Sequence, residues 1–140
     1  MALTTEAATT KGVDSTDASH QALDAAFSLT GEFGSVVCIS GETDYVVRGS
    51  AVAKIKNGHP MMPRVTGLGC TATALCGAFS AVQSDTAQAV AEAMAVMGIA
   101  GELAAVDAPG PGTLQFRFID ALYRLNKFDI RNRLNVEEGS

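Results

Sequence analysis

The sequence is poor in positive charge. Its 140 residues contain 10 lysine and arginine residues against 15 aspartate and glutamate residues, which gives a formal net charge of −5. A protein that follows nucleic-acid phosphates needs a basic stripe on its surface, and this chain shows none. The composition therefore excludes a nucleic-acid partner of the usual kind. Any phosphate chemistry has to depend on backbone N–H groups and a metal ion, because the sequence shows no cluster of basic side chains.

Cysteine and histidine are also scarce. Cys38, Cys70 and Cys76 are an odd number, lie among apolar neighbours and lack the paired spacing of a disulfide framework. This usage predicts a cytoplasmic protein. The two histidines, His20 and His59, have no cluster of Cys, Asp or Glu beside them at ligand spacing, so the sequence predicts no metal-ligating residues.

Long hydrophobic runs are missing as well. Residues Met1 to Asp14 are rich in Thr and Ala and contain no apolar signal core. The longest small or apolar run in the later helices, Ala93 to Gly101, is far shorter than the ~20 residues that a membrane span needs. We therefore expect no membrane association. With 47% hydrophobic and 18% charged residues, the composition predicts a packed globular domain of ordinary size.

The first half of the chain predicts one helix and three strands. Apolar periodicity predicts a helix from about Thr16 to Phe33 with one buried stripe. Ser35-Val-Val-Cys-Ile-Ser40 is typical of a strand that is buried on both faces between parallel neighbours. Asp44–Arg48 and Ala51–Lys56 predict a hairpin that turns at Gly49-Ser50.

Apolar periodicity predicts three further helices, at about Gly69–Val82, Asp85–Val106 and Thr113–Lys127, the last capped by Thr113. The middle one is apolar nearly all round, so it should be covered on several sides. Its Gly98 and Gly101 each cost ~1 kcal/mol relative to alanine, which indicates close packing against a neighbour. The polar tail from Asp129 to Ser140 is expected to be loose.

These elements predict an α/β fold with one buried strand and a hairpin packed with about four helices. No internal repeat or linker divides residues 1–140, so they are interpreted as one domain. One fully apolar strand and a hairpin are too little sheet for helices of this hydrophobicity. Either partner chains complete the core, or part of the domain is absent.

The segment Val65-Thr-Gly-Leu-Gly-Cys70 directly precedes an apolar helix. Gly67 and Gly69 let the backbone turn tightly, and the helix adds its unpaired N–H groups and the positive end of its dipole. This combination suits a phosphate group. Cys70 falls in the first turn, where the dipole stabilises a thiolate. From these residues alone, a simple tight turn and a small core cysteine remain open as alternatives, and the other two cysteines are predicted to be core residues.

Five motifs in order suggest a family. They are Lys11-Gly-Val-Asp-Ser15, Ser40-Gly-Glu-Thr-Asp-Tyr-Val46, Asn57-Gly-His-Pro-Met-Met62, Val65-Thr-Gly-Leu-Gly-Cys70 and Gly110-Pro-Gly-Thr113. Together they resemble the C-terminal part of hydroxyethylthiazole kinase, a member of the ribokinase-like superfamily. The resemblance extends to about Leu125.

The resemblance implies transfer of the γ-phosphate of ATP to the hydroxyl of 4-methyl-5-(2-hydroxyethyl)thiazole, a step towards thiamine. It implies Mg²⁺, and trimers with active sites at subunit contacts. Cys70 takes the position of the catalytic Asp of ribokinase relatives. Gly67 matches a substrate-contacting glycine, and Ser40 stands where the family usually has an ATP-contacting Thr. The backbone of Thr66, Gly67, Leu68 and Gly69 would form the anion hole, with Leu68 in place of a smaller residue.

The resemblance also has a limit. In the family, the segment that resembles Met1-Ala-Leu3 follows an Asn-Ala-Ser-Glu-type motif whose acidic residue serves the metal ion and the nucleotide. That motif, an ATP-contacting Arg before it and a substrate-contacting Met have no counterpart here. We therefore expect residues 1–140 to be the C-terminal portion of one kinase domain. The first alternative is a truncated, inactive fragment that self-associates. The second is a thiol enzyme with Cys70 as nucleophile, which would need a histidine base.

Overall fold

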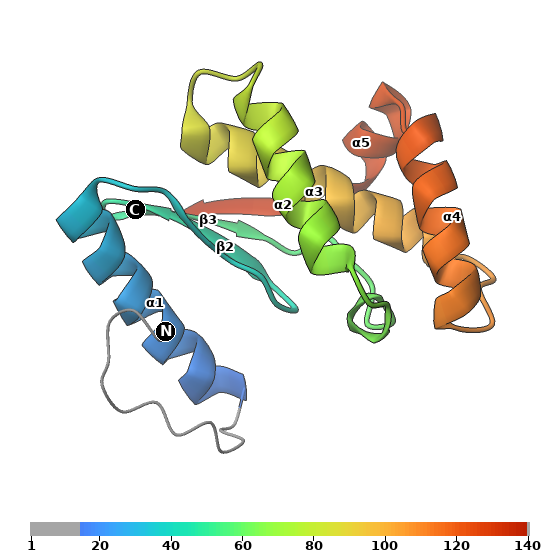
Figure 1. Ribbon diagram of the computed structural model, residues 1–140, viewed down its shortest axis with the longest axis horizontal. Coiled ribbons are helices and arrows are strands. Elements are labelled where there is room, and N and C mark those ends of the chain that lie inside the picture. Colours follow the sequence, from blue (N-terminus) through green and yellow to red (C-terminus); the bar gives the residue numbers. More distant parts are fainter. Residues whose placement is uncertain (1–14, 140) are drawn as a thin grey trace.

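Five α-helices and one four-stranded sheet make up residues 15–139, the part of the chain that the computed structural model describes (Figure 1). The helices are α1 (Ser15–Phe33), α2 (Leu68–Ser80), α3 (Thr86–Ala105), α4 (Pro111–Arg124) and α5 (Lys127–Arg133). The strands are β1 (Val37–Ile39), β2 (Asp44–Arg48), β3 (Ala51–Ile55) and β4 (Val136–Gly139). Side chains are described from Gln21 onward, so Met1-Ala-Leu3, the Lys11–Asp14 part of the first motif and the His20 side chain lie outside the description.

The predicted hairpin is confirmed, and its sheet is antiparallel throughout in the order β1-β2-β3-β4. Val46 on β2 lies opposite Cys38 on β1 and opposite Ala53 on β3. The β2–β3 turn contains Gly49 at φ +59°, a left-handed conformation that glycine adopts without steric cost.

Strand β1 differs from its prediction. It pairs antiparallel with β2, and within residues 15–139 no strand lies along its other edge. Val37 and Ile39 are half-buried and Cys38 is exposed. The prediction of a strand buried on both faces between parallel neighbours is therefore wrong for the described chain, and so is that of Cys38 as a core residue. The reason is that β1 is an edge strand here.

Residues 129–139 of the polar tail form regular structure, contrary to the expectation of a loose end. Its first part is α5, which begins with a capping box: the Asn126 side chain accepts from the backbone N–H of Asp129, whose side chain accepts in turn from the N–H of Asn126. Its last part is β4, which pairs with β3 and adds a 2.5 Å contact between Lys56 and Glu137. Backbone pairing, which needs no apolar side chains, explains why the hydrophobic pattern missed β4.

The helix predictions hold with shifted ends. α2 and α3 lie within two residues of the predicted spans, and α3 is capped by Asp85, whose side chain accepts from the N–H of Gln88. α4 ends at Arg124, before α5 begins, so there are five helices and not about four. Its N-cap is Gly110 and not Thr113, because Pro111 already takes the first helical position.

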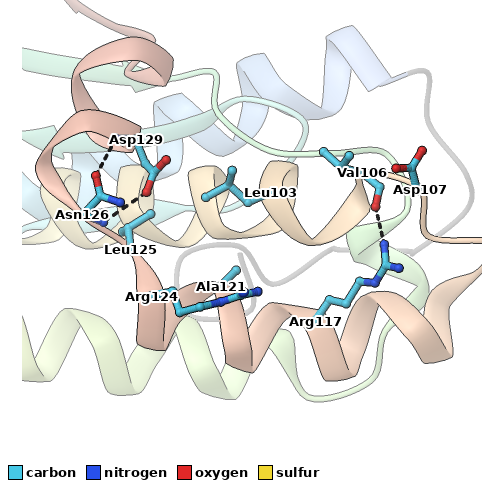
Figure 2. A pocket seen from close by; sticks show the side chains of 9 residues that line it. All are labelled: Leu103, Val106, Asp107, Arg117, Ala121, Arg124, Leu125, Asn126 and Asp129. Atoms are coloured by element: carbon cyan, nitrogen blue, oxygen red, sulfur yellow. Dashed lines mark hydrogen bonds between the residues drawn. The ribbon is translucent and has the colours of Figure 1, made fainter.

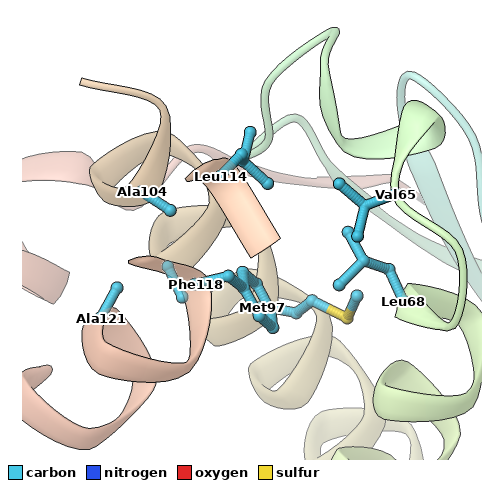
Figure 3. Close-up of a cluster of buried hydrophobic side chains, with 8 residues drawn as sticks. Val65, Leu68, Met97, Ala104, Leu114, Phe118 and Ala121 are labelled. Carbon is cyan, nitrogen blue, oxygen red and sulfur yellow. The ribbon is translucent and has the colours of Figure 1, made fainter. Parts of the chain in front are cut away.

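Helices cover both faces of the sheet (Figure 1). On one face, Val46 and Ile55 pack against Val90 and Met94 of α3. Val47 is the next residue after Val46 on β2, so its side chain points to the opposite face, where α1 lies, and it is fully buried. A second apolar cluster joins α3 to α4 and to the segment before α2 (Figure 3). Its buried members are Val65, Leu68, Met97, Ala100, Ala104, Leu114, Phe118 and Ala121.

The central helix α3 is covered on several sides, as its composition predicts. Its mean hydropathy of 1.2 over an 18-residue window is high enough for a membrane span. This window is longer than the apolar run Ala93 to Gly101 that the sequence showed. However, 56% of the window is buried inside the protein. This burial fits the core helix of a globular domain.

Candidate functional site

The candidate site is the turn that leads from Val65 into α2. Gly67 precedes the helix at φ +95°, a left-handed conformation that favours glycine. The first backbone hydrogen bond of α2 runs from the Thr71 N–H to the Gly67 carbonyl at 3.1 Å. The N–H groups of Leu68, Gly69 and Cys70 therefore precede the helical ladder and are the unpaired donors of its first turn.

Two apolar side chains anchor this turn. Val65 and Leu68 are 7% and 9% exposed and belong to the cluster beneath α3 and α4 (Figure 3). Thr66, Gly67 and Gly69 lie on the opposite, exposed side. The turn therefore presents its backbone to the surface from a fixed base, as an anion-binding loop requires.

The three cysteines lie in different surroundings. Cys70 is exposed in the first turn of α2. Burial raises the pKa of Cys76, and nearby Asp44 raises it further. Burial also raises the pKa of Cys38 to about 12, with Asp44 and Cys76 adding to the effect, although much of its side chain reaches the surface. Because the thiolate is the reactive form, Cys38 and Cys76 are unsuited to nucleophilic chemistry.

Ser40 lies directly after β1 on an exposed turn. The turn is held by Asp44, whose Oδ1 accepts a 2.9 Å hydrogen bond from the Gly41 N–H. Asp44 is only 8% exposed, and burial raises its pKa while the Gly41 hydrogen bond lowers it. Sequence reasoning placed Asp44 only at the start of the second predicted strand, because no local signal marks a carboxylate that accepts from an N–H three residues before it.

Asn57 is a second residue that sequence reasoning missed. It is 5% exposed, and its side-chain amide donates to Glu102 Oε1 at 2.9 Å and to the Arg133 carbonyl at 2.7 Å. Its Oδ1 accepts from the Asn135 N–H at 2.9 Å. Asn57 thus ties the loop after β3 to α3 and to the start of β4. This network holds the chain segment that leads to the Gly67 turn.

His59 follows in the same loop and is half-buried. Its Nδ1 accepts a hydrogen bond from the Met61 N–H at 3.2 Å. This local bond occupies one ring nitrogen, and no hydrogen bond between His59 and Cys70 is found among the described residues. The thiol-enzyme alternative gains no base from His59.

The described residues do not supply a magnesium site. No three His, Cys, Asp or Glu side chains between residues 15 and 139 are grouped so that they could hold a metal ion. Within residues 15–139, no group of side chains fits the Mg²⁺ that the family resemblance implies.

Two open depressions lie elsewhere on the molecule. One of about 570 Å³ lies between the end of α3, α4 and α5, with Arg117 and Arg124 on one side and Asp107 and Asp129 on the other (Figure 2). The other, of about 1050 Å³, lies between the first half of α3 and strands β3 and β4. Neither of these two depressions is lined by Ser40 or by Thr66–Cys70.

The sheet covered by helices on both faces, with a glycine turn opening onto α2, defines an α/β protein, the class to which the ribokinase-like fold belongs. A solved structure titled hydroxyethylthiazole kinase from Pyrococcus horikoshii OT3 matches it with a TM-score of 0.82 and 35% identity, over 89% of this chain and 48% of that one. The model of the hydroxyethylthiazole kinase family matches residues 1–127. The chain belongs to the hydroxyethylthiazole kinase family.

Curated relatives agree. The hydroxyethylthiazole kinase of Syntrophus aciditrophicus (strain SB) is 59% identical over 93% of this chain and 48% of its own length. That of Leptospira biflexa serovar Patoc (strain Patoc 1 / Ames) is 53% identical over 91% of this chain and 48% of its own length. The chain therefore spans about half the length of the relatives that it matches.

Proposed function

We propose that this chain carries the phosphoryl-transfer loop of a hydroxyethylthiazole kinase, which moves the γ-phosphate of ATP to the hydroxyl of 4-methyl-5-(2-hydroxyethyl)thiazole. The observation that supports this proposal most directly is that Cys70 is exposed in the first turn of α2, three residues after Gly67, whose backbone is in the left-handed conformation. Family membership and the names of the relatives support the reaction. They do not favour the alternative of an inactive, self-associating fragment.

The loop would act mainly by positioning and by charge stabilisation, which dominate phosphoryl transfer. The N–H groups of Leu68, Gly69 and Cys70 point out of the helix start, and with the backbone of Thr66 and Gly67 they would hold the transferring phosphoryl group. The positive end of the α2 dipole acts in the same direction. No basic side chain is needed for this stabilisation.

Cys70 would orient the hydroxyl of the substrate or accept its proton, and Gly67 would contact the substrate. The alcohol becomes acidic only late in a loose transition state, so its proton needs an acceptor only at that stage. Ser40, exposed on the turn held by Asp44, would contact ATP through its hydroxyl.

Further assignments follow from the same proposal. The thiazole alcohol and ATP are the small-molecule partners, with Mg²⁺ as the metal ion, and the assembled enzyme is a cytoplasmic homo-oligomer, a trimer by family resemblance. Residues 1–140 would form the C-terminal portion of the kinase domain. The ligands for Mg²⁺ would then come from ATP and from outside these residues.

The test replaces Cys70 in an assembled enzyme. The chain is combined with the part of the S. aciditrophicus kinase that it does not match, and ATP-dependent phosphorylation of the thiazole alcohol is measured. We expect Cys70→Ala to lower kcat by roughly 100-fold or more, the range of a lost proton acceptor. Cys76→Ala, on the same helix, is the matched control and should leave kcat nearly unchanged. Equal activity of the two variants would contradict the role of Cys70.

A further inference from the structure

Helix α3 carries two carboxylates in different settings. Glu92 accepts a hydrogen bond from Gln88, one turn before it, on the surface of the helix. The Glu102 side chain is only 22% exposed, and its Oε1 accepts two hydrogen bonds from the loop after β3. One comes from the Asn57 side-chain amide at 2.9 Å and the other from the Gly58 N–H at 3.1 Å. Glu102 therefore has its partners in another segment of the chain, and the proposed mechanism gives it no role.

The loop from Asn57 to Val65 is held against α3 along its length. At its start, Asn57 approaches Gly98 so closely that a Cβ on the helix would have no room. In its middle, Met62 lies over Gly101, and the Met62 carbonyl accepts from the Val65 N–H at 3.0 Å. At its end, Val65 is buried in the cluster that joins α3 to α4. The loop therefore has little freedom to move relative to α3 while these contacts are kept.

The candidate site begins directly after this loop. Thr66 is the next residue and is exposed, and Gly67 then opens α2. A displacement at Asn57 would be passed along a short, internally hydrogen-bonded segment to the N–H groups of Leu68–Cys70. Catalytic groups are sensitive to such displacements, because a shift of about 1 Å caused far from the chemistry can cost about 100-fold in rate. The two Glu102 hydrogen bonds thus lie at the start of a segment that ends in the proposed phosphate-binding turn.

We propose that Glu102 is a positioning residue for phosphoryl transfer, which acts by fixing the loop that sets the place of the Gly67–Cys70 turn. The role requires an oxygen at the right reach, and it does not require a negative charge. The charge has only a distant partner, since Arg133 lies 3.5 Å from Oε2 and its side chain is 37% exposed, and exposed ion pairs contribute little. The proposal rests on the proposed function, which assigns this turn to the transferring phosphoryl group.

Two conservative variants separate reach from charge. Glu102→Gln keeps an oxygen at the same distance from the backbone and removes the charge, so it should retain the kcat of the parent. Glu102→Asp keeps the charge and shortens the side chain by one methylene group, so it should withdraw the oxygen from the loop and lower kcat by about 10–100-fold. Its KM for ATP should stay within about twofold of the parent value, the pattern of an interaction lost in the transition state. The kinetics are measured in the assembled enzyme used for the Cys70 variants.

Two controls separate positioning from a general loss of stability. Val47→Ala removes fully buried volume on the opposite face of the sheet, so it should lower the urea midpoint and leave kcat nearly unchanged. In the chain alone, Glu102→Asp should speed hydrogen exchange at Gly58 and Val65, whose N–H groups are hydrogen-bonded in the parent. Exchange in β2 should not change, because no contact of Glu102 reaches that strand among the hydrogen bonds of the described residues.

The outcomes that overturn the proposal are specific. They are a Glu102→Asp enzyme with the kcat of the parent, or a Glu102→Gln enzyme that is as slow as the Glu102→Asp enzyme. The Glu102→Gln variant keeps the test decisive if Glu102→Asp does not fold, because a loss of kcat in Glu102→Gln contradicts the proposal by itself. An assembled parent enzyme that does not phosphorylate the thiazole alcohol would contradict the proposed function instead. Unchanged exchange in Glu102→Asp would still overturn the assignment of the loop to Glu102.

Discussion

Individual residues in α3 show how closely this fold is packed. Gly98 faces the backbone of Asn57, and a Cβ built there would lie 2.5 Å from the Asn57 carbonyl oxygen. Gly101 faces the flexible end of the Met62 side chain, where a Cβ would also overlap. Both contacts confirm the close packing predicted from two glycines inside an apolar helix. The partners themselves, both in the loop after β3, were not predictable, because nothing in the sequence says which segment crosses α3.

These two glycines should respond differently to alanine. Gly98→Ala pushes against backbone that the Asn57 hydrogen bonds hold in place, so we expect a loss of about 1–3 kcal/mol in the free energy of unfolding, as for an overpacked core. Gly101→Ala should cost less, because the Met62 side chain can move and alanine contributes ~1 kcal/mol of helix propensity. Urea denaturation measures both. Gly77→Ala on α2, where nothing lies within 4 Å, is the control and should stabilise; a stable Gly98→Ala protein would contradict the packing argument.

At the scale of elements, turns and caps decide where strands and helices end. The β1–β2 connection depends on Asp44, which begins β2 and accepts from the Gly41 N–H. The α4–α5 break depends on the capping box at Asn126, and the β3–β4 pairing depends on backbone hydrogen bonds. Hydrophobic periodicity located the hairpin, α2 and α3 because these elements bury an apolar face. It missed α5 and β4 because local hydrogen bonds and strand pairing define them.

The Asp44 turn leads to a pH-dependent prediction. Burial raises the pKa of Asp44 in the folded chain above its ordinary value of 3.8. Folding therefore disfavours the ionised form of the Asp44 carboxyl group. As the pH rises from the pKa of the unfolded chain through the higher pKa of the folded chain, the group ionises and the free energy of unfolding decreases. Asp44→Asn keeps an oxygen for the Gly41 N–H and removes the charge. We expect the variant to unfold at higher urea than the parent at pH 7, with the difference shrinking towards pH 4; a variant that is less stable at pH 7 would refute this account.

At the scale of the whole molecule, the chain carries a fixed Gly67 turn but few of the groups that a kinase needs around it. The described residues offer no metal-holding cluster, and neither depression is lined by the candidate site residues. The sheet ends at an unprotected β1 edge, and the relatives are about twice as long as the matched region. The described sheet has four strands, and it is packed against a helix as apolar as α3.

We therefore expect the isolated chain not to phosphorylate the thiazole alcohol at a measurable rate. The proposed phosphate-binding loop is present, but no group of side chains that could hold a metal ion lies among the described residues. The measurement is product formation from ATP with the purified chain alone, beside the complex with the unmatched part of the S. aciditrophicus kinase as a positive control. Steady turnover by the chain alone would show that residues 1–140 are sufficient.

The sequence by itself determined the family, the hairpin, the spans of α2 and α3, and the position of the Gly67–Cys70 turn. It could do so because glycine spacing, apolar periodicity and motif order are local properties of the chain. Only the tertiary structure showed that β1 is an edge strand, that the tail completes the sheet, and that Asn57 and Asp44 hold the loops that carry the candidate residues. These features depend on contacts between segments far apart in the chain, such as Asn57 with Glu102 and Asn135, and local sequence patterns do not record which distant segments meet.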